Sequence, residues 1–342
     1  MPRITMLLLL TALTSFANTP KPVVPESGYL SSNRLKYHGY LFVGDVLQKK
    51  DELKRIREYS NIIMFLSTYE EESPYLNITS DSPDRTEAKR EFLRKEGKRI
   101  AFLDSLGFEI IWPDPLGSLI KAGDVETYKK ELRFIKKNLP EMELVDIIYP
   151  CDEPNLNDVS AETLEKSIDV FKAEFPEVKT MFCYAIVHPK FLDSKAPENA
   201  DILAIDPYMF TTHFENKAAD FEAHYRENLA CALDWVNRQD KPFIMVADSF
   251  SSTPGEGKKM PVAETSLWYY MLALTQPDCV GLAWFYYGVP IEDGRHAGFE
   301  LGTASEALKK THREIGETIL GKESRLGLEW FDEKPKEEPV GE

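Results

Sequence analysis

From Tyr40 towards the C-terminus, short apolar runs alternate with longer amphipathic stretches. This order is typical of a parallel sheet whose strands are joined by crossover helices. Runs such as IIMFL, DIIYP and FIMVA are apolar almost without interruption, which indicates strands covered on both faces. A closed barrel surrounded by helices meets that requirement. We therefore predict a single α/β domain, a parallel (β/α)8 TIM-type barrel over residues 37–330.

The positions of the predicted strands and helices support this interpretation. Eight strands are predicted, at Tyr40–Val43, Asn61–Leu66, Phe108–Trp112, Leu144–Tyr149, Thr180–Tyr184, Ile202–Ile205, Pro242–Val246 and Val280–Phe285. The predicted helices are Asp51–Tyr59, Asp84–Leu106, Asp124–Asn138, Ser160–Glu174, Phe221–Arg238, Pro261–Thr275 and Ser305–Leu320. A doubly wound open sheet is the alternative architecture, but no glycine fingerprint follows the first strand.

The N-terminus indicates export. Met1–Ala17 has one basic residue, a short apolar run and small residues near its end, so we predict a signal peptide and a secreted or periplasmic protein. A retained N-terminal anchor is the alternative. Residues 18–36 are expected to form a lead-in to the barrel, and residues 331–342 a disordered acidic tail.

The net charge of the chain limits the kinds of partner that it is expected to bind. The net charge of −16 becomes −17 when Arg3 leaves with the signal peptide, which argues against nucleic acid and against stable membrane association. A neutral or cationic partner is favoured. The four cysteines show no C-x-x-C pair, and we expect buried free thiols, although export would permit a bridge: Cys151, Cys183, Cys231 and Cys279.

The segment Ser67–Arg85 is longer than a routine loop. It contains Asn77, an acceptor for glycosylation in a eukaryotic host. It either borders the functional site or is a surface insertion.

Polar residues follow most of the predicted strands. Catalytic groups of (β/α)8 barrels lie at the C-terminal ends of the strands, so these residues are expected to meet at one mouth. They are mainly acidic and aromatic: Asp45, Asp114, Asp152, Glu153, Asp206, Tyr208, Asp248, Trp284, Tyr286 and Tyr287. Because neighbouring residues of a strand point in opposite directions, at most one of Tyr286 and Tyr287 can line the mouth.

Carboxyl groups gathered in this way shift one another's pKa values apart or meet a positive charge. Glycoside hydrolysis uses such a pair, one group protonating the leaving oxygen and the other stabilising or attacking the oxocarbenium-like centre. Aromatic rings give sugars an apolar face to stack on. The composition of the mouth therefore favours a carbohydrate substrate.

The segment Tyr149–Asn155, YPCDEPN, carries the strongest local signal. Its Pro154 is expected to push Glu153 into an extended conformation. Here the sequence resembles the (β/α)8 glycoside hydrolases, whose large clan has its acid/base Glu in an Asn-Glu-Pro triplet at this strand end. Glu153 and Pro154 match that triplet, and the segments Ile205–Tyr208 and Gly281–Trp284 add to the likeness.

Two positions depart from that pattern. Asp152 stands where the clan has Asn, and Asp248 stands on strand seven where the clan has its nucleophilic Glu. An adjacent Asp-Glu pair also resembles the hexosaminidase-like barrels, in which the 2-acetamido group of the substrate attacks. That resemblance implies that Asp152 orients the acetamido group and that Glu153 is the general acid.

The resulting hypothesis is a glycosidase that needs no cofactor and no metal ion. Glu153 is its predicted acid/base and Asp152 its assistant, with Asp248 and Asp206 as alternative second carboxylates. The predicted substrate-binding residues are Asp206, Tyr208, Trp284, Tyr286, Asp114 and Asp45. Two other functions stay open: a carbohydrate-binding barrel without catalysis, and a metal-dependent hydrolase or lyase built on the acidic cluster.

Overall fold

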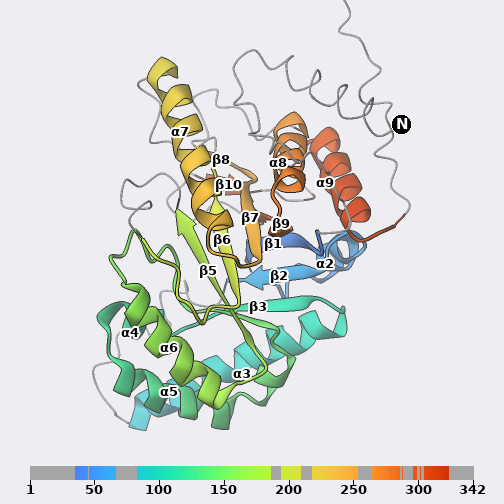
Figure 1. Ribbon diagram of the computed structural model, residues 1–342. Helices are drawn as coiled ribbons and strands as arrows, with labels where there is room; N and C mark the ends of the chain where they lie inside the picture. Colours follow the sequence, from blue (N-terminus) through green and yellow to red (C-terminus); the bar gives the residue numbers. More distant parts are fainter. Residues whose placement is uncertain are drawn as a thin grey trace, which may run out of the picture.

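The computed structural model describes residues 35–44, 46–66, 83–185, 194–208, 218–252, 263–285, 287, 296–298, 301 and 304–322. Within these residues, eight parallel strands close into a barrel in sequence order, and the last of them pairs with the first. The barrel strands are β1 (Tyr37–Val43), β2 (Ile62–Phe65), β3 (Glu109–Pro113), β4 (Ile147–Tyr149), β5 (Lys179–Ala185), β6 (Ile202–Asp206), β7 (Phe243–Asp248) and β9 (Cys279–Phe285). The predicted (β/α)8 barrel is confirmed (Figure 1).

Strand residues alternate between two cores. The side chains of Ile62, Met64, Ile111, Ile244 and Val246, among others, fill the barrel interior. The intervening residues pack outwards against the helices in a second, larger core. Because both faces are buried, the strands are apolar nearly throughout, as the sequence pattern predicts.

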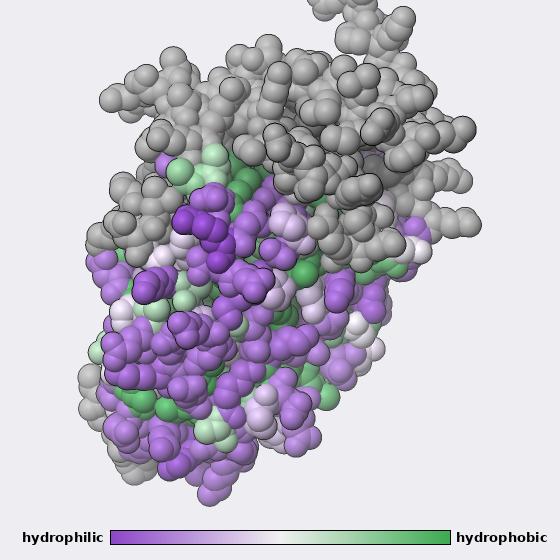
Figure 2. Space-filling model, viewed as in Figure 1, coloured by the Kyte–Doolittle hydropathy of each residue, from purple (hydrophilic) through white to green (hydrophobic). Residues whose placement is uncertain are grey.

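Helices follow the strands and cover the barrel (Figure 1). They are α2 (Lys50–Arg57), α3 (Pro83–Ser105), α4 (Gly117–Ala122), α5 (Val125–Asn138), α6 (Ala161–Glu174), α7 (Ala218–Asn237), α8 (Ala263–Thr275) and α9 (Glu306–Ile319). The predicted starts at Asp124, Ser160 and Ser305 are N-caps, whose side chains accept a hydrogen bond from a backbone N–H of the first turn. Figure 2 shows that the face formed by α3, α5 and α6 is mainly hydrophilic.

Three local features depart from the predicted elements. Strand β4 is shorter than predicted: Leu144 ends the 3-10 helix η2 (Pro140–Leu144), and Val145 and Asp146 connect that helix to the strand. The short helix α4 and an antiparallel pair, β8 (Phe250–Ser252) with β10 (His296–Gly298), were not predicted. All three are too short to show a clear hydrophobic period.

Several sequence-based expectations can be compared with the structure only in part. The four cysteines are free, and Cys151, Cys183 and Cys279 are buried as expected, whereas Cys231 is only partly buried. Among the described residues, no helix is long and apolar enough to cross a membrane. The predicted signal peptide, Asn77 and the acidic tail lie outside the described residues.

A buried polar network fixes α9 and β9 to the start of the barrel. His38 lies fully buried on β1, where its Nδ1 donates to the carbonyl of Tyr59 (2.8 Å) and its Nε2 accepts from Trp284 Nε1 (2.9 Å). The ring of Trp284 stacks on His312 of α9 at 4.1 Å between centroids, and the hydroxyl of Tyr40 bonds to His312 Nδ1. Because His38 must accept from an indole N–H, it is neutral in this arrangement.

We expect this network to make the fold sensitive to acid. Burial lowers the pKa of His38 from 6.5 to about 4, so the unfolded chain takes up a proton in this window that the folded chain does not. Stability is therefore lost as the pH falls from 6.5 towards 4, by up to about 1.4 kcal/mol per pH unit. The measurement is urea unfolding across this range for wild type and His38→Gln. A variant whose pH slope equals that of wild type would contradict the assignment.

Candidate active site

The loop after β4 carries the predicted acidic pair at the C-terminal mouth of the barrel. Asp152 forms an isolated parallel bridge with Cys183 of β5, which continues the sheet beyond the end of β4. Asn155 anchors the loop on the same neighbour: its Nδ2 donates to the Ala185 carbonyl (2.9 Å) and its Oδ1 accepts from Ala185 N–H (3.2 Å). The pair thus lies on a loop held at both ends.

The backbone of Glu153 is not extended, which corrects the expectation drawn from Pro154. Its φ of 43° lies in the left-handed region, which is unfavourable for a residue with a Cβ. A tight turn holds it there, because the Glu153 carbonyl accepts from the N–H groups of Leu156 (2.9 Å) and Asn157 (3.2 Å) and from the Asn157 side chain (3.0 Å). Strain of this kind is typical of functional sites.

Glu153 meets Asp206, which ends strand β6. The two carboxyl groups share a hydrogen bond, which requires that one of them holds a proton. Burial raises the pKa of both, and the pKa of Asp206 lies well above its ordinary range because Glu153 adds to the effect of burial. Asp206 is 4% exposed, and its Oδ1 has no hydrogen-bond partner among the described residues.

A contact this close does not fit the spacing of two carboxyl groups on opposite sides of a scissile bond, which favours another role for Asp206. The two carboxyl groups of an ordinary glycosidase stand about 5 Å apart in retaining enzymes and about 6.5 to 9.5 Å apart in inverting ones. Two groups joined by a hydrogen bond lie much closer than this. Asp206 therefore belongs with Glu153 on one side of the site.

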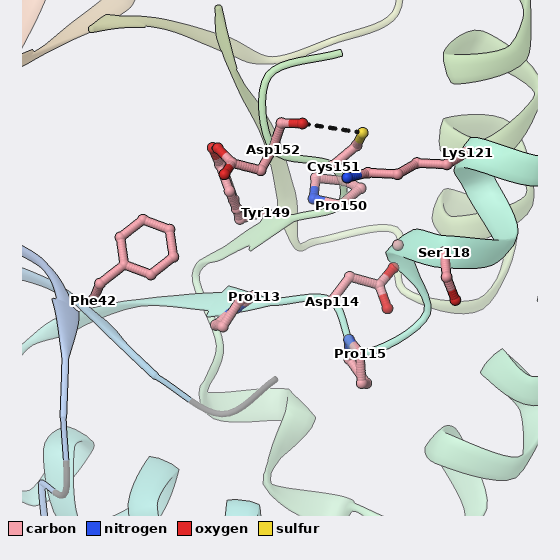
Figure 3. Close-up of a pocket in the computed structure, with 11 residues that line it drawn as sticks. Phe42, Pro113, Asp114, Pro115, Ser118, Lys121, Tyr149, Pro150, Cys151 and Asp152 are labelled. Atoms are coloured by element: carbon pink, nitrogen blue, oxygen red, sulfur yellow. Dashed lines mark hydrogen bonds between the residues drawn. The ribbon is translucent and has the colours of Figure 1, made fainter. Parts of the chain in front are cut away.

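Asp152 is the second member of the acidic pair. Its carboxylate accepts a short hydrogen bond from the Tyr149 hydroxyl. Burial raises the pKa of Asp152, whereas this bond and the charge of Lys121 act in the opposite direction. Figure 3 shows Asp152 beside Tyr149, with Lys121 reaching from α4 towards Cys151.

A cavity of about 210 Å³ opens beside Asp152 (Figure 3). The ends of β1, β3 and β4 and the first turn of α4 form its walls. Its lining residues are Phe42, Pro113, Asp114, Pro115, Gly117, Ser118, Lys121, Tyr149, Pro150, Cys151 and Asp152. Hydroxyl and amide groups of a small polar ligand would find both acidic and aromatic partners here.

Asp114 lines the cavity but is engaged in the protein. Its carboxylate accepts from the Tyr128 hydroxyl (2.7 Å) and the Leu116 N–H (2.8 Å). Burial raises the pKa of Asp114 to about 6, against the effect of these bonds. The residue therefore shapes the loop before α4 and contributes to the wall of the cavity.

Aromatic rings stand next to the acidic groups inside the barrel mouth. Tyr208, half-buried, stacks on Phe285 at 5.4 Å, and Phe42 packs edge-on against both Phe285 (5.2 Å) and Tyr149 (6.4 Å). Phe42 has a φ of 55°, and the register between β1 and β2 shifts between Tyr40 and Val43. This irregularity brings both Leu41 and Phe42 into the interior core.

The structure corrects the expectation for Trp284. It is fully buried on the outer face of β9, between His38 and His312, and does not face the barrel interior. The next residue, Phe285, faces inwards in its place because side chains alternate along a strand. Tyr287 also lies in the outer core, where its hydroxyl donates to Glu52 (2.6 Å).

Asp248 ends β7 but is enclosed. It is 1% exposed, and its carboxylate accepts a short hydrogen bond from the hydroxyl of Tyr269 on α8. The Tyr269 hydroxyl oxygen also lies 2.6 Å from the Pro207 carbonyl oxygen, so Tyr269 links the ends of β6 and β7. Asp248, like Glu153 and Asp206, does not line the cavity, and its role as a second carboxylate stays a prediction.

The remaining predicted residues, Asp45 and Tyr286, lie outside the described residues. The sequence interpretation did not single out Phe42, Phe285, Tyr149 or Lys121. Strand alternation could have identified Phe285, since Gly281 and Ala283 leave room on the same face. Among the described residues, no group of three or more His, Cys, Asp or Glu side chains is arranged to hold a metal ion.

Comparison with known proteins agrees with this architecture. No protein-family model matches the sequence, and no curated protein matches it. Among solved structures, Cel5A from Thermotoga maritima, in complex with a mannotriose substrate, has a TM-score of 0.55 at 11% identity, over 82% of this chain and 99% of that one. PbGH5A from Prevotella bryantii, a glycoside hydrolase family 5 enzyme, has a TM-score of 0.51 at 12% identity, over 87% and 99%.

A third similar structure is a GH5_18 protein from Bifidobacterium longum subsp. longum in complex with Manβ1-4GlcNAc. Its TM-score is 0.54 at 11% identity, over 84% of this chain and 79% of that one. The chain is thus a (β/α)8 barrel with acidic groups at its mouth. Its fold is that of the family 5 glycoside hydrolases, in agreement with the resemblance seen in the sequence.

Proposed function

We propose that the protein is a glycoside hydrolase that acts on a 2-acetamido sugar, with Glu153 as the general acid/base. The observation that carries the proposal is the adjacent pair Asp152–Glu153, held at the barrel mouth with the carboxyl of Glu153 hydrogen-bonded to Asp206. A general acid needs a proton at hand, and burial raises the pKa values of both carboxyl groups of the Glu153–Asp206 contact. The likeness in fold to glycoside hydrolases supports this class of reaction.

The chemistry proceeds by assistance from the substrate. The acetamido oxygen attacks C1 while Glu153 protonates the departing glycosidic oxygen. Asp152, oriented by Tyr149, accepts from the acetamido N–H and offsets the positive charge that develops on the cyclised intermediate. Water then opens this intermediate, giving its proton back to Glu153 and its hydroxyl to C1.

The enclosure of Asp248 favours this route over a protein nucleophile on β7. The GH5_18 structure that holds Manβ1-4GlcNAc shows a 2-acetamido sugar on a barrel of this kind. The proposed substrate is an extracellular or periplasmic glycan, because Met1–Ala17 is predicted to direct export.

We expect the mature protein to hydrolyse aryl 2-acetamido glycosides in preference to the matched aryl glycosides without that group. Asp152→Asn should lower kcat on the acetamido substrates by about 10² to 10³-fold, because the amide cannot balance the positive charge of the intermediate. Steady-state kinetics on the paired substrates measure this, with the exposed Asp104→Asn as the matched control.

Two other outcomes would assign a different function to the site. Hydrolysis confined to sugars without the acetamido group would contradict assistance by the substrate and return the search to a protein nucleophile. Binding of the sugars, seen by calorimetry, without any turnover would favour the carbohydrate-binding barrel.

A further inference from the structure

The contact between Glu153 and Asp206 joins two strands that are not neighbours in the barrel. Glu153 follows β4, Asp206 ends β6, and β5 lies between them. Strand β6 alternates so that Ile202 and Ala204 fill the barrel interior, which places Asp206 on the same inward face at the mouth. Asp206 therefore reaches Glu153 across the top of β5.

Asp206 is almost fully shielded from water, and Glu153 is the carboxyl group that shares a hydrogen bond with it among the described residues. Asp206 is 4% exposed, and its Oδ1 has no partner within the described residues. Its own carbonyl accepts from the Tyr208 N–H (2.8 Å), which turns the chain directly after the strand. A buried carboxyl group with one free oxygen and one carboxyl partner is most stable when the pair holds a proton.

We propose that Glu153 and Asp206 hold one proton between them at neutral pH, and that Asp206 is the positioning residue that keeps Glu153 able to act as an acid. The catalytic role of Asp206 rests on the proposed function, whereas the shared proton does not depend on it. In the resting pair the proton lies on Asp206, which donates to the carboxylate of Glu153. When the glycosidic oxygen arrives, the proton moves from Asp206 to Glu153 and from Glu153 to that oxygen, and the attacking water later restores a proton to the pair.

The charges around the pair set its titration. Asp152 repels a second negative charge, and Cys183 and Tyr208 are neutral neighbours whose pKa values are raised by burial. The hydrogen bond from Asp206 and the charge of Lys121 on α4 act in the opposite direction and lower the pKa of Glu153. The two protons of the pair are therefore lost at separate pH values, and the last of them is lost above the ordinary carboxyl range.

The variant Asp206→Asn separates the hydrogen bond that residue 206 donates to Glu153 from the proton that Asp206 supplies. Its amide N–H still donates to the Glu153 carboxylate, but the partner no longer carries a titratable proton or a negative charge. Glu153 then titrates alone and loses its proton at a lower pH than the wild-type pair loses its last one. The basic limb of the pH profile of kcat/KM is therefore expected to move to lower pH by about one unit or more.

The first measurement needs no substrate. Carbon-13 NMR of the Asp and Glu carboxyl carbons, on the whole mature chain, follows each group through a pH titration. We expect one carboxyl pair in the wild type to keep a proton well above the ordinary carboxyl range, and this signal to vanish in Asp206→Asn. The exposed Asp234→Asn, whose side chain pairs with Arg238 on the surface, is the control and should keep it.

The outcomes distinguish this inference from the proposed function. A wild-type protein whose Glu153 and Asp206 both titrate in the ordinary range would overturn the shared proton, even if the enzyme hydrolyses glycosides. A shared proton in the wild type, together with a complete lack of glycoside hydrolysis, would support the pair and overturn only the proposed reaction. Because the wild-type titration decides the question, the test does not depend on the folding of the variant.

Discussion

Replacing Glu153 by Gln is expected to lower kcat/KM on glycosides with a poor leaving group by about 10² to 10⁴-fold. Gln has the shape of Glu and can accept the hydrogen bond from Asp206, but it has no proton to give to the leaving oxygen. Substrates whose leaving group departs as an anion need less protonation, so their loss should be much smaller. The measurement is kcat/KM for a series of aryl glycosides of increasing leaving-group pKa.

The slope of that series is the decisive quantity. For wild type we expect a shallow dependence on leaving-group pKa, and for Glu153→Gln a steep one. Glu162→Gln is the matched control, because Glu162 lies exposed on α6 and pairs only with the surface residue Lys166. An equal loss on good and poor leaving groups would show that Glu153 positions the substrate and does not protonate it.

The fold was predictable because its signals are repeated. Each barrel strand is buried on both faces, so each appears as an apolar run, and the helix starts at Asp124, Ser160 and Ser305 carry their own capping residues. A small error at one strand leaves the order of elements unchanged. Short elements such as α4, η2 and β8 were not predicted, because they are too short to show a hydrophobic periodicity.

The site was less predictable because it depends on where individual side chains point. The sequence placed Asp152, Glu153 and Asp206 at strand ends, but not the hydrogen bond between the last two. It pointed to Trp284 because this aromatic residue stands at the mouth end of the last strand, although alternation along β9 turns Phe285 inwards. The irregular backbone at Phe42 and at Glu153 could not be derived from composition, since both take left-handed conformations that the local sequence disfavours.

A buried ion pair holds two of the outer helices together. Lys89 of α3 donates from Nζ to both carboxylate oxygens of Glu131 on α5, at 2.8 and 2.7 Å. The two residues are only 5% and 3% exposed. Salt screens such a pair much less than a surface pair.

Lys89→Met is therefore expected to lower the free energy of unfolding by about 3 to 5 kcal/mol, because it leaves the carboxylate of Glu131 buried without its cation. Urea unfolding measures the loss. Lys54→Met, which breaks an exposed pair with Asp51 on α2, should cost less than about 1 kcal/mol and serves as the control.

The double variant Lys89→Met/Glu131→Leu separates the pair's net contribution from the penalty of a lone charge. Two apolar side chains of similar volume leave no buried charge, so most of the stability lost in Lys89→Met should return. If the double variant were as unstable as the single one, the loss would arise from packing between α3 and α5. If Lys89→Met alone were nearly as stable as wild type, water would reach Glu131, and the two helices would be joined by their apolar contacts.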